Sequence, residues 1–330
     1  MEASQILEVK DLRVHFHTLE GTVKAVNGVS FALNKGETLG LVGESGCGKS
    51  VTALTILKLI PSPPAHIAGG QVVLHGENLV EALNERMRQI RGGQISMIFQ
   101  EPMTSLNPVF TIGHQIAETF RIHQSLGGRA ARDATVDVLS KVQMPSPQKR
   151  LKEFPHQLSG GMRQRVMIAM ALACNPEILI ADEPTTALDV TIQAQILDLM
   201  LALREKMGTA ILMITHDLGV IAETAQRVVV FYAGKVMESG DVRTIFKSPF
   251  HPYTIGLLNS VPRLGGRSKG AKSRLHEIPG TVPSMYELPN GCLFAPRCKW
   301  SMDICNHERP KLRTLEPGHQ VRCWLERSPA

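Results

Sequence analysis

One short segment of the sequence has the residue types and the spacing needed to hold phosphate. Residues 43–50, GESGCGKS, match the pattern G-x-x-x-x-G-K-[ST], which describes a phosphate-binding loop. Its glycines let backbone N–H groups curl around phosphate oxygens, and the following helix adds the partial positive charge of its N-terminus. Lys49 is expected to reach the β- and γ-phosphates of a nucleotide, and the Ser50 hydroxyl is expected to ligate Mg²⁺. The predicted nucleotide contacts in this segment are Gly43, Glu44, Ser45, Gly46, Cys47, Gly48, Lys49, Ser50 and Val51.

Two acidic residues end an apolar segment further along the chain. Residues 178–183, ILIADE, read as a buried strand that ends in Asp182 and Glu183. Asp182 fits the acid that holds Mg²⁺ in P-loop proteins, and Glu183 is placed to polarise an attacking water as general base. An ordinary acidic strand end is the alternative for this segment by itself. Its position after a phosphate-binding loop favours the catalytic interpretation.

A second glycine-rich helix start lies between these two motifs. Residues 158–162, LSGGM, precede a long apolar helix, so Ser159, Gly160 and Gly161 form a helix N-terminus that can bind an anion through bare amides. One such cradle is enough for the chain's own nucleotide, and a second one makes sense if it faces the phosphate of another subunit. A plain helix N-cap with flexible glycines is the alternative.

Strand and helix patterns alternate around these motifs, which indicates an α/β core with a mostly parallel sheet. Between Gln100 and Asn175 the strand pattern disappears, so this part is expected to be a helical insertion. From His251 onward the composition shifts to Pro, Gly, Arg and Cys, which indicates a separate C-terminal extension. The expected strands are Ile6–Val9, Val26–Leu33, Thr38–Val42, Ile178–Ala181, Thr209–Ile214 and Arg227–Phe231. The expected helices are Lys49–Ile60, Gly113–Gln124, Arg129–Val142 and Gly160–Cys174.

The composition is that of an ordinary globular protein, with 43% hydrophobic and 20% charged residues. The start of the chain does not resemble a secretory signal, and the apolar runs are far shorter than the roughly 18 residues of a membrane span. The protein is therefore expected to be cytoplasmic. The net charge of +6 resides in residues 251–330, with 12 Lys/Arg against 6 Asp/Glu. A solvated basic tail explains this charge, and contact with anionic lipid or nucleic acid is the alternative.

The order of the motifs resembles the ABC ATPases over residues 6–250. The series is Gly43–Ser50, Gln100, Leu158–Met162, Ile178–Glu183 and Thr186–Asp189, followed by His216. This resemblance implies a P-loop NTPase fold of the RecA-like type. It predicts a nucleotide-binding core at residues 1–100 and 176–250, a helical signature subdomain at 101–175 and an extension at 251–330.

The resemblance also implies roles for single residues. Gln100 would touch Mg²⁺ and the attacking water and couple to a membrane partner. Asp189 would lie at a dimer interface, and His216 would hydrogen-bond the γ-phosphate and orient Glu183. Phe16 resembles the aromatic residue that stacks on adenine, with Phe31 as the alternative. Two subunits would enclose two ATP molecules, each between one phosphate-binding loop and the partner's Ser159, Gly160 and Gly161.

Three local segments narrow the resemblance to the dipeptide, oligopeptide and nickel importer ATPases. They are Gln100–Pro108, Ala187–Gln195 and Ser248–Thr254. The resemblance implies ATP and Mg²⁺ as cofactors and a location on the cytoplasmic side of the membrane. The implied partners are a second ATPase in a heterodimer or homodimer, two transmembrane permeases and, indirectly, an external solute-binding protein. Di- and oligopeptides are the expected cargo, and nickel or another small solute is the alternative.

Four of the six cysteines lie in the extension, at Cys292, Cys298, Cys305 and Cys323. In a loop-rich cytosolic tail this grouping suggests a metal site rather than disulfides. Zinc sites usually show C-x₂₋₄-C pairs, which are absent here, whereas a [4Fe–4S] cluster tolerates varied spacing. The cluster, a zinc ion and free thiols all remain open.

The sequence also bears on two other functional classes. A nucleic-acid ABC ATPase would explain the basic tail, but the single ATPase copy, without a heptad run or aromatic–basic interleaving, argues against it. We therefore expect no specific nucleic-acid partner. A regulatory ATPase without hydrolysis would lack Glu183 or an intact signature segment, and both are present.

Overall fold

The computed structural model describes residues 4–100, 105–186, 189–260 and 277–329. These residues form two compact units, each built from several stretches of the chain. The first unit comprises residues 1–6, 33–38 and 81–214, and the second comprises residues 7–32, 39–80 and 215–330. These units group residues by their contacts and do not test the predicted domain boundaries, which stay a prediction.

The first unit combines three parallel strands with a group of helices. Strand β6 pairs with β7, and β7 pairs with β8, all in parallel. Every residue of β7 and of β8 is buried, as expected for parallel strands that are covered on both faces. The strands are β6 (Ile95–Ile98), β7 (Ile178–Asp182) and β8 (Ala210–Ile214). The helices are α2 (Asn84–Ile90), α4 (Ile112–Gln124), α5 (Gly128–Lys141), α6 (Pro147–Arg150), α7 (Gly160–Leu172) and α8 (Val190–Met207), with the short 3-10 turn Pro155–Gln157.

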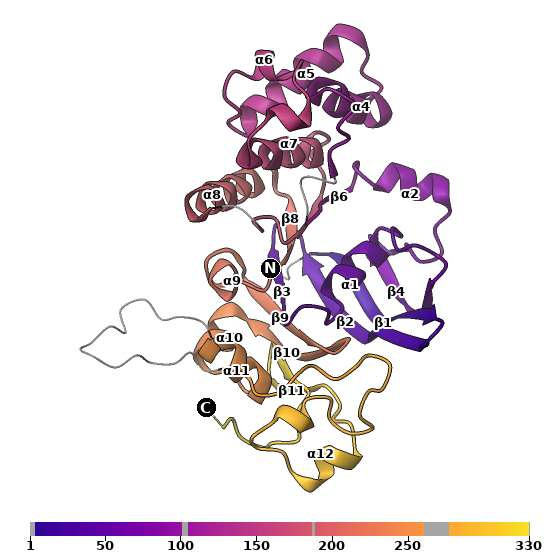
Figure 1. Cartoon of the computed structure of the whole chain (residues 1–330), viewed down its shortest axis with the longest axis vertical. Coiled ribbons are helices and arrows are strands. Elements are labelled where there is room, and N and C mark those ends of the chain that lie inside the picture. Colours follow the sequence, from indigo (N-terminus) through magenta and orange to yellow (C-terminus); the bar gives the residue numbers. More distant parts are fainter. Residues whose placement is uncertain (1–3, 101–104, 187–188, 261–276, 330) are drawn as a thin grey trace, which may run out of the picture. The chain divides into compact units, whose positions relative to one another are not determined.

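Helices α4, α5 and α7 contact one another pairwise and form the helical insertion that the sequence predicts (Figure 1). Helix α4 is amphipathic, and it buries Ile112, Ile116 and Phe120 on one face. Thr111 caps its start by accepting a hydrogen bond from the His114 N–H at 3.3 Å. Among the described residues between β6 and β7 there is no strand, which confirms the predicted loss of strand pattern.

The second unit contains an antiparallel sheet of order β2-β1-β4-β5 and the strands β3, β9, β10, β12 and β11 of a second sheet. Strand β3 pairs with β9 in parallel, whereas β10 pairs with β9 in antiparallel orientation. The strands are β1 (Gln5–Thr18), β2 (Gly21–Asn34), β3 (Thr38–Val42), β4 (Ala65–Leu74), β5 (Glu77–Asn78), β9 (Arg227–Tyr232), β10 (Lys235–Asp241), β11 (Arg313–Glu316) and β12 (His319–Val321). The helices are α1 (Lys49–Ile56), α9 (Leu218–Thr224), α10 (Val242–Lys247), α11 (Pro252–Ser260) and α12 (Asp303–His307), with the 3-10 turn Ala295–Arg297.

The extension is less separate than its composition predicts. Its strand β12 pairs with β10, where Glu238 faces Val321 and Ser239 faces Gln320, and β11 continues the sheet beyond β12. The extension is loop-rich, as expected, but it also contributes these two short strands, which were not predicted. Short strands escaped the pattern because a segment of three or four residues is too short to show an alternation. The basic stretch 261–276 lies outside the described residues.

Candidate functional site

The phosphate-binding loop is built as the sequence predicts, between the buried strand β3 and helix α1. Gly43 has a φ of 150°, and a Cβ there would lie 2.2 Å from the Phe231 carbonyl oxygen. Gly48 has a φ of 102°, and its Cβ would lie 2.3 Å from the Ala25 carbonyl oxygen. Only glycine fits two positions that combine this backbone conformation with such close contacts.

Lys49 is buried, with 5% of its surface exposed, and its ammonium group is held by the loop itself. It donates hydrogen bonds to the carbonyl oxygens of Gly43 at 2.8 Å and Glu44 at 3.0 Å. Its Nζ also lies 3.5 Å from the Cys47 Sγ, and burial raises the pKa of that thiol. A cation held among backbone groups and a helix N-terminus makes the loop suited to an anion.

The loop is also held from the C-terminal extension, which the sequence analysis did not foresee. The Glu44 N–H donates to the Tyr253 hydroxyl at 2.8 Å, and the Glu44 carboxylate pairs with Arg297 at 2.6 and 2.9 Å. Tyr253 lies in Ser248–Thr254, one of the segments that resemble the importer ATPases, so the sequence had already marked this region as functional. Arg297 had none, because 253 residues separate it from Glu44.

The first unit carries the acidic part of the predicted site. Glu183 follows β7 with a φ of 46°, an uncommon conformation for a non-glycine residue and one that often marks a functional position. Its Oε2 accepts hydrogen bonds from Gln100 Nε2 and from the Thr186 hydroxyl, each at 3.0 Å. Asp182, the last residue of β7, is 4% exposed. The structure thus brings Gln100 to Glu183 and adds a contact from Thr186, for which the motif Thr186–Asp189 predicted no role.

The two segments predicted to face a partner's nucleotide lie close together in this unit. Ser159 caps α7 by accepting from the Met162 N–H at 3.4 Å, and Asp189 caps α8 by accepting from the Ile192 N–H at 2.9 Å. A Cβ on Gly161 would lie 2.9 Å from Ile192 Cγ2, so the starts of α7 and α8 are in contact. Ala187 and Leu188 of the motif around Asp189 lie outside the described residues.

Helix α7 is also tied to the segment after Glu183. Its buried Gln164 donates a side-chain hydrogen bond to the Pro184 carbonyl oxygen. This glutamine was not predicted as a functional residue, because a polar residue inside an apolar helix gave no motif. The bond links the helix that carries Gly160 and Gly161 to the loop that carries the catalytic candidate.

The remaining predicted residues belong to the second unit. Phe16 lies half-buried in β1 opposite Ala65, whereas the alternative, Phe31, is buried in the core with 8% exposure. Because Phe16 is more exposed than Phe31, it is the better candidate for stacking on the adenine of a nucleotide. His216 is exposed in the turn between β8 and α9. Its roles toward the γ-phosphate and Glu183 stay predictions.

The four cysteines of the extension line one small cavity together with His251, Phe294 and Trp324. All four are free thiols, and burial raises the pKa of Cys292 and of Cys298 to about 11. The cavity does not amount to a formed metal centre. No three His, Cys, Asp or Glu side chains in the described part of the chain are grouped closely enough to hold a metal ion.

A glycine-shaped phosphate loop at the start of a helix, and an acid pair at the end of a buried parallel strand, define a P-loop nucleotide-binding protein. Comparison with known proteins specifies the class. The family model described as "ABC transporter" matches residues 26–186, and that described as "Oligopeptide/dipeptide transporter, C-terminal region" matches residues 237–305. The chain belongs to the family of ABC transporter ATP-binding proteins, which use ATP and Mg²⁺.

Its curated relatives match over almost their whole length. A probable peptide ABC transporter ATP-binding protein, y4tR of Sinorhizobium fredii, is 53% identical, covering 98% of this chain and 96% of the relative. The dipeptide transport ATP-binding protein DppD of Bacillus subtilis is 51% identical, covering 98% and 95%. The ATP-binding cassette MJ0796, solved as a dimer bound to ADP and Pi, is similar with a TM-score of 0.65 and 27% identity, covering 72% of this chain and 99% of that one.

Within the described residues, no helix is both long enough and apolar enough to span a membrane.

Proposed function

We propose that this chain binds and hydrolyses ATP to drive the import of di- and oligopeptides through a membrane transporter. The observation that carries the proposal is the match of 98–99% of the chain, extension included, to relatives named for peptide transport, dipeptide transport and, in one case, peptide import. The match to the C-terminal region named for oligopeptide and dipeptide transporters supports the same cargo. Import of nickel or another small solute is the alternative.

In this proposal Glu183 is the general base for water. Two donors on the same carboxylate oxygen, Gln100 and Thr186, hold its side chain in one orientation. A base held in this way removes a proton from water without first reorganising. Gln100 thereby takes part in catalysis through Glu183, and His216 completes the predicted catalytic set.

The residues that would hold the nucleotide and its metal have suitable chemistry. The Ser50 hydroxyl, the buried Asp182 carboxylate and the Gln100 amide supply the hard oxygen donors that Mg²⁺ prefers. Bound Mg²⁺ would neutralise charge on the phosphates. Residues 43–51 would surround those phosphates, with Lys49 as the fixed positive charge, and Phe16 would stack on the base.

The proposed active form is a dimer. Ser159, Gly160, Gly161 and Asp189 lie on adjoining helix starts, which supports a single surface that contacts the partner's nucleotide. The similar cassette MJ0796 was solved as a dimer. The partner would be a second, related ATPase or a second copy of this chain. The dimer would bind two permease subunits on the cytoplasmic face of the membrane, and an external solute-binding protein would supply cargo.

For the extension we propose that Cys292, Cys298, Cys305 and Cys323 hold a [4Fe–4S] cluster, with zinc as the alternative. Four thiols on one cavity supply the donor set for either group. Iron, sulfide and zinc analysis after anaerobic purification tests this. Metal-free protein with four titratable thiols in the extension would refute both metals.

The import proposal is tested by uptake of labelled dipeptide, oligopeptide and nickel in cells carrying wild type or Glu183→Gln. Loss of the base should lower hydrolysis by about 10²–10⁴-fold, so the dependent cargo should stop accumulating. Glu85→Gln, an exposed acid on α2, serves as the matched control. Loss of nickel uptake alone would select the alternative cargo. Normal uptake of all three, in cells without other peptide importers, would refute the importer function.

A further inference from the structure

The C-terminal extension forms an ion pair with the phosphate-binding loop. Arg297, in the 3-10 turn Ala295–Arg297, has a side chain that is 4% exposed. It forms a two-point ion pair with Glu44, the second residue of the loop, at 2.6 and 2.9 Å. Both residues belong to the second unit, so the contact is internal to it.

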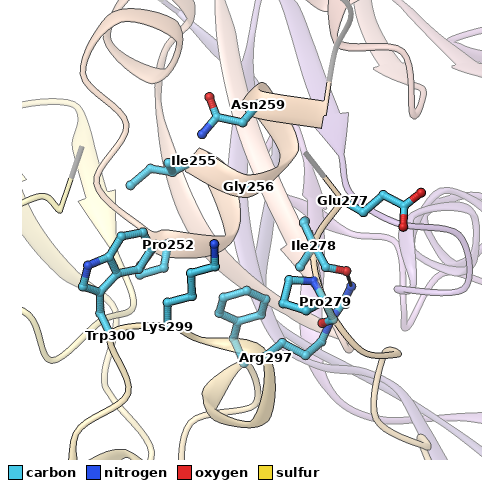
Figure 2. A pocket seen from close by; sticks show the side chains of 11 residues that line it. Pro252, Ile255, Gly256, Asn259, Glu277, Ile278, Pro279, Arg297, Lys299 and Trp300 are labelled. Atoms are coloured by element: carbon cyan, nitrogen blue, oxygen red, sulfur yellow. Dashed lines mark hydrogen bonds between the residues drawn. The ribbon is translucent and has the colours of Figure 1, made fainter. Parts of the chain in front are cut away.

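All five N–H groups of the Arg297 guanidinium have an acceptor, which is the full capacity of this side chain. Nε donates to the Pro279 carbonyl at 2.9 Å. One terminal nitrogen donates to Glu44 and, at 3.3 Å, to the Tyr232 hydroxyl, and the other donates to Glu44 and, at 3.3 Å, to the Ile278 carbonyl. Figure 2 shows Arg297 beside Pro279 and Ile278. A cation with every donor used has a single orientation.

Glu44 passes this constraint to the centre of the loop. Its N–H is held by the Tyr253 hydroxyl at 2.8 Å, and its carbonyl oxygen accepts from Lys49 Nζ at 3.0 Å. The carboxylate, the N–H and the carbonyl of Glu44 are thus each bound to a different residue. The position of Lys49, the expected phosphate ligand, depends directly on that of Glu44.

Charge gives the contact a second consequence. A carboxylate inside an anion-binding loop repels the phosphates of ATP, and this repulsion is weakly screened where the groups are partly buried. The Glu44 side chain is 28% exposed. A guanidinium that binds both of its oxygens cancels the charge and holds the carboxylate in place.

We propose that Arg297 is a positioning residue for nucleotide binding, which neutralises Glu44 and thereby fixes the loop that holds Lys49. The extension is then a part of the ATP site of its own chain. This role concerns nucleotide affinity alone, so it holds whichever cargo the transporter carries.

The test compares Arg297→Gln with wild type in the purified full-length chain, using a fluorescent ATP analogue displaced by ATP. We expect the Kd and KM for ATP to rise about tenfold, with kcat at saturation changed less than about twofold, since the catalytic acids are untouched. Arg309→Gln is the matched control, because Arg309 lies in the same extension and donates to the carbonyls of Pro289 and Gly291. It should leave the Kd unchanged.

A double variant separates positioning from simple attachment of the extension. In the double variant Arg297→Gln with Glu44→Gln, the unpaired carboxylate is gone, so the Kd for ATP should recover to within about threefold of wild type.

The two tryptophans of the chain, Trp300 and Trp324, both lie in the extension, so their fluorescence reports its folding separately. If Arg297→Gln lowers the melting midpoint of this signal while the Kd for ATP is unchanged, the contact only attaches the extension and the proposal is wrong. A double variant that binds ATP no better than Arg297→Gln overturns the neutralisation argument. If Arg297→Gln does not fold, Arg297→Lys replaces it in the test, because lysine keeps the charge. Its Kd for ATP should lie between that of wild type and the tenfold higher value expected for Arg297→Gln.

Discussion

Glu238 of β10 is the residue whose replacement should most clearly loosen the extension. Its side chain is fully buried and accepts three hydrogen bonds. Oε1 accepts from the Phe250 N–H and from His319 Nε2, both at 2.8 Å, and Oε2 accepts from the His251 N–H at 2.9 Å. Because a carboxylate only accepts, His319 must carry its proton on Nε2. One buried carboxylate thus holds both the start of α11 and strand β12.

Glu238→Gln preserves the size of the side chain and changes only this bonding. The amide oxygen can stand at the Oε1 position and keep two bonds, but the NH₂ group then faces the His251 N–H. One charge-assisted bond is lost and two buried donors are left opposed, which costs about 2–4 kcal/mol. For a chain of this size that corresponds to a fall in melting temperature of roughly 3–6 °C.

Tryptophan fluorescence during heating is the direct assay, since both tryptophans lie in the extension. Glu316→Gln, an exposed acid on the neighbouring strand β11, should melt like wild type. The ATP affinity of Glu238→Gln should fall as well, because the Glu238 contact to His251 places Tyr253 two residues later. A melting temperature within about 1 °C of wild type would refute the reasoning, because a fully buried carboxylate with three donors cannot be replaced without loss.

The remaining predictions concern the loop and pH. Gly43→Ala should weaken ATP binding by at least about tenfold, since its Cβ would meet the Phe231 carbonyl. Gly127→Ala, where a Cβ meets open space, is the control. An unchanged ATP affinity in Gly43→Ala would contradict the prediction. Burial lowers the pKa of Lys235 to about 8. The folded state therefore disfavours the charged lysine, and stability should rise between pH 8 and 10.5 by about 1 kcal/mol after discounting for screening. Urea unfolding at pH 7.5 and 9.5 should show this rise in wild type and its loss in Lys235→Met; equal slopes in both would contradict it.

The backbone around the local motifs is what the sequence predicted well. Helix start, glycine positions and strand end around residues 38–50 and 178–183 follow from short-range rules, because the residues that act together are neighbours in the chain. The predicted helix Lys49–Ile60 was too long: α1 ends at Ile56 and turns follow. The predicted strand Ile6–Val9 was too short: β1 runs from Gln5 to Thr18, and its pairing with β4 overrides its irregular pattern.

Contacts over long chain separations could not be predicted in this way. In the sequence, Arg297 was only one of the 12 Lys/Arg residues of the extension, and nothing distinguished it from the others. Its meaning comes from the fold, which places it beside one particular carboxylate.

The contacts of the extension with the phosphate-binding loop indicate what the extension does in this chain. A solvated tail would have no buried ion pair. Burying Arg297 costs more solvation free energy than leaving an arginine on the surface, so its contacts argue against a purely solvated tail. Glu238, Tyr253 and Arg297 all lie within residues 237–305, the range matched by the C-terminal region of oligopeptide and dipeptide transporters. The same region therefore carries the anchor of the extension, the hydroxyl that binds the loop and the cation that neutralises it. Any change that moves this region, including occupation of the cysteine-lined cavity to which Cys298, the residue after Arg297, contributes, should reach the nucleotide through Glu44.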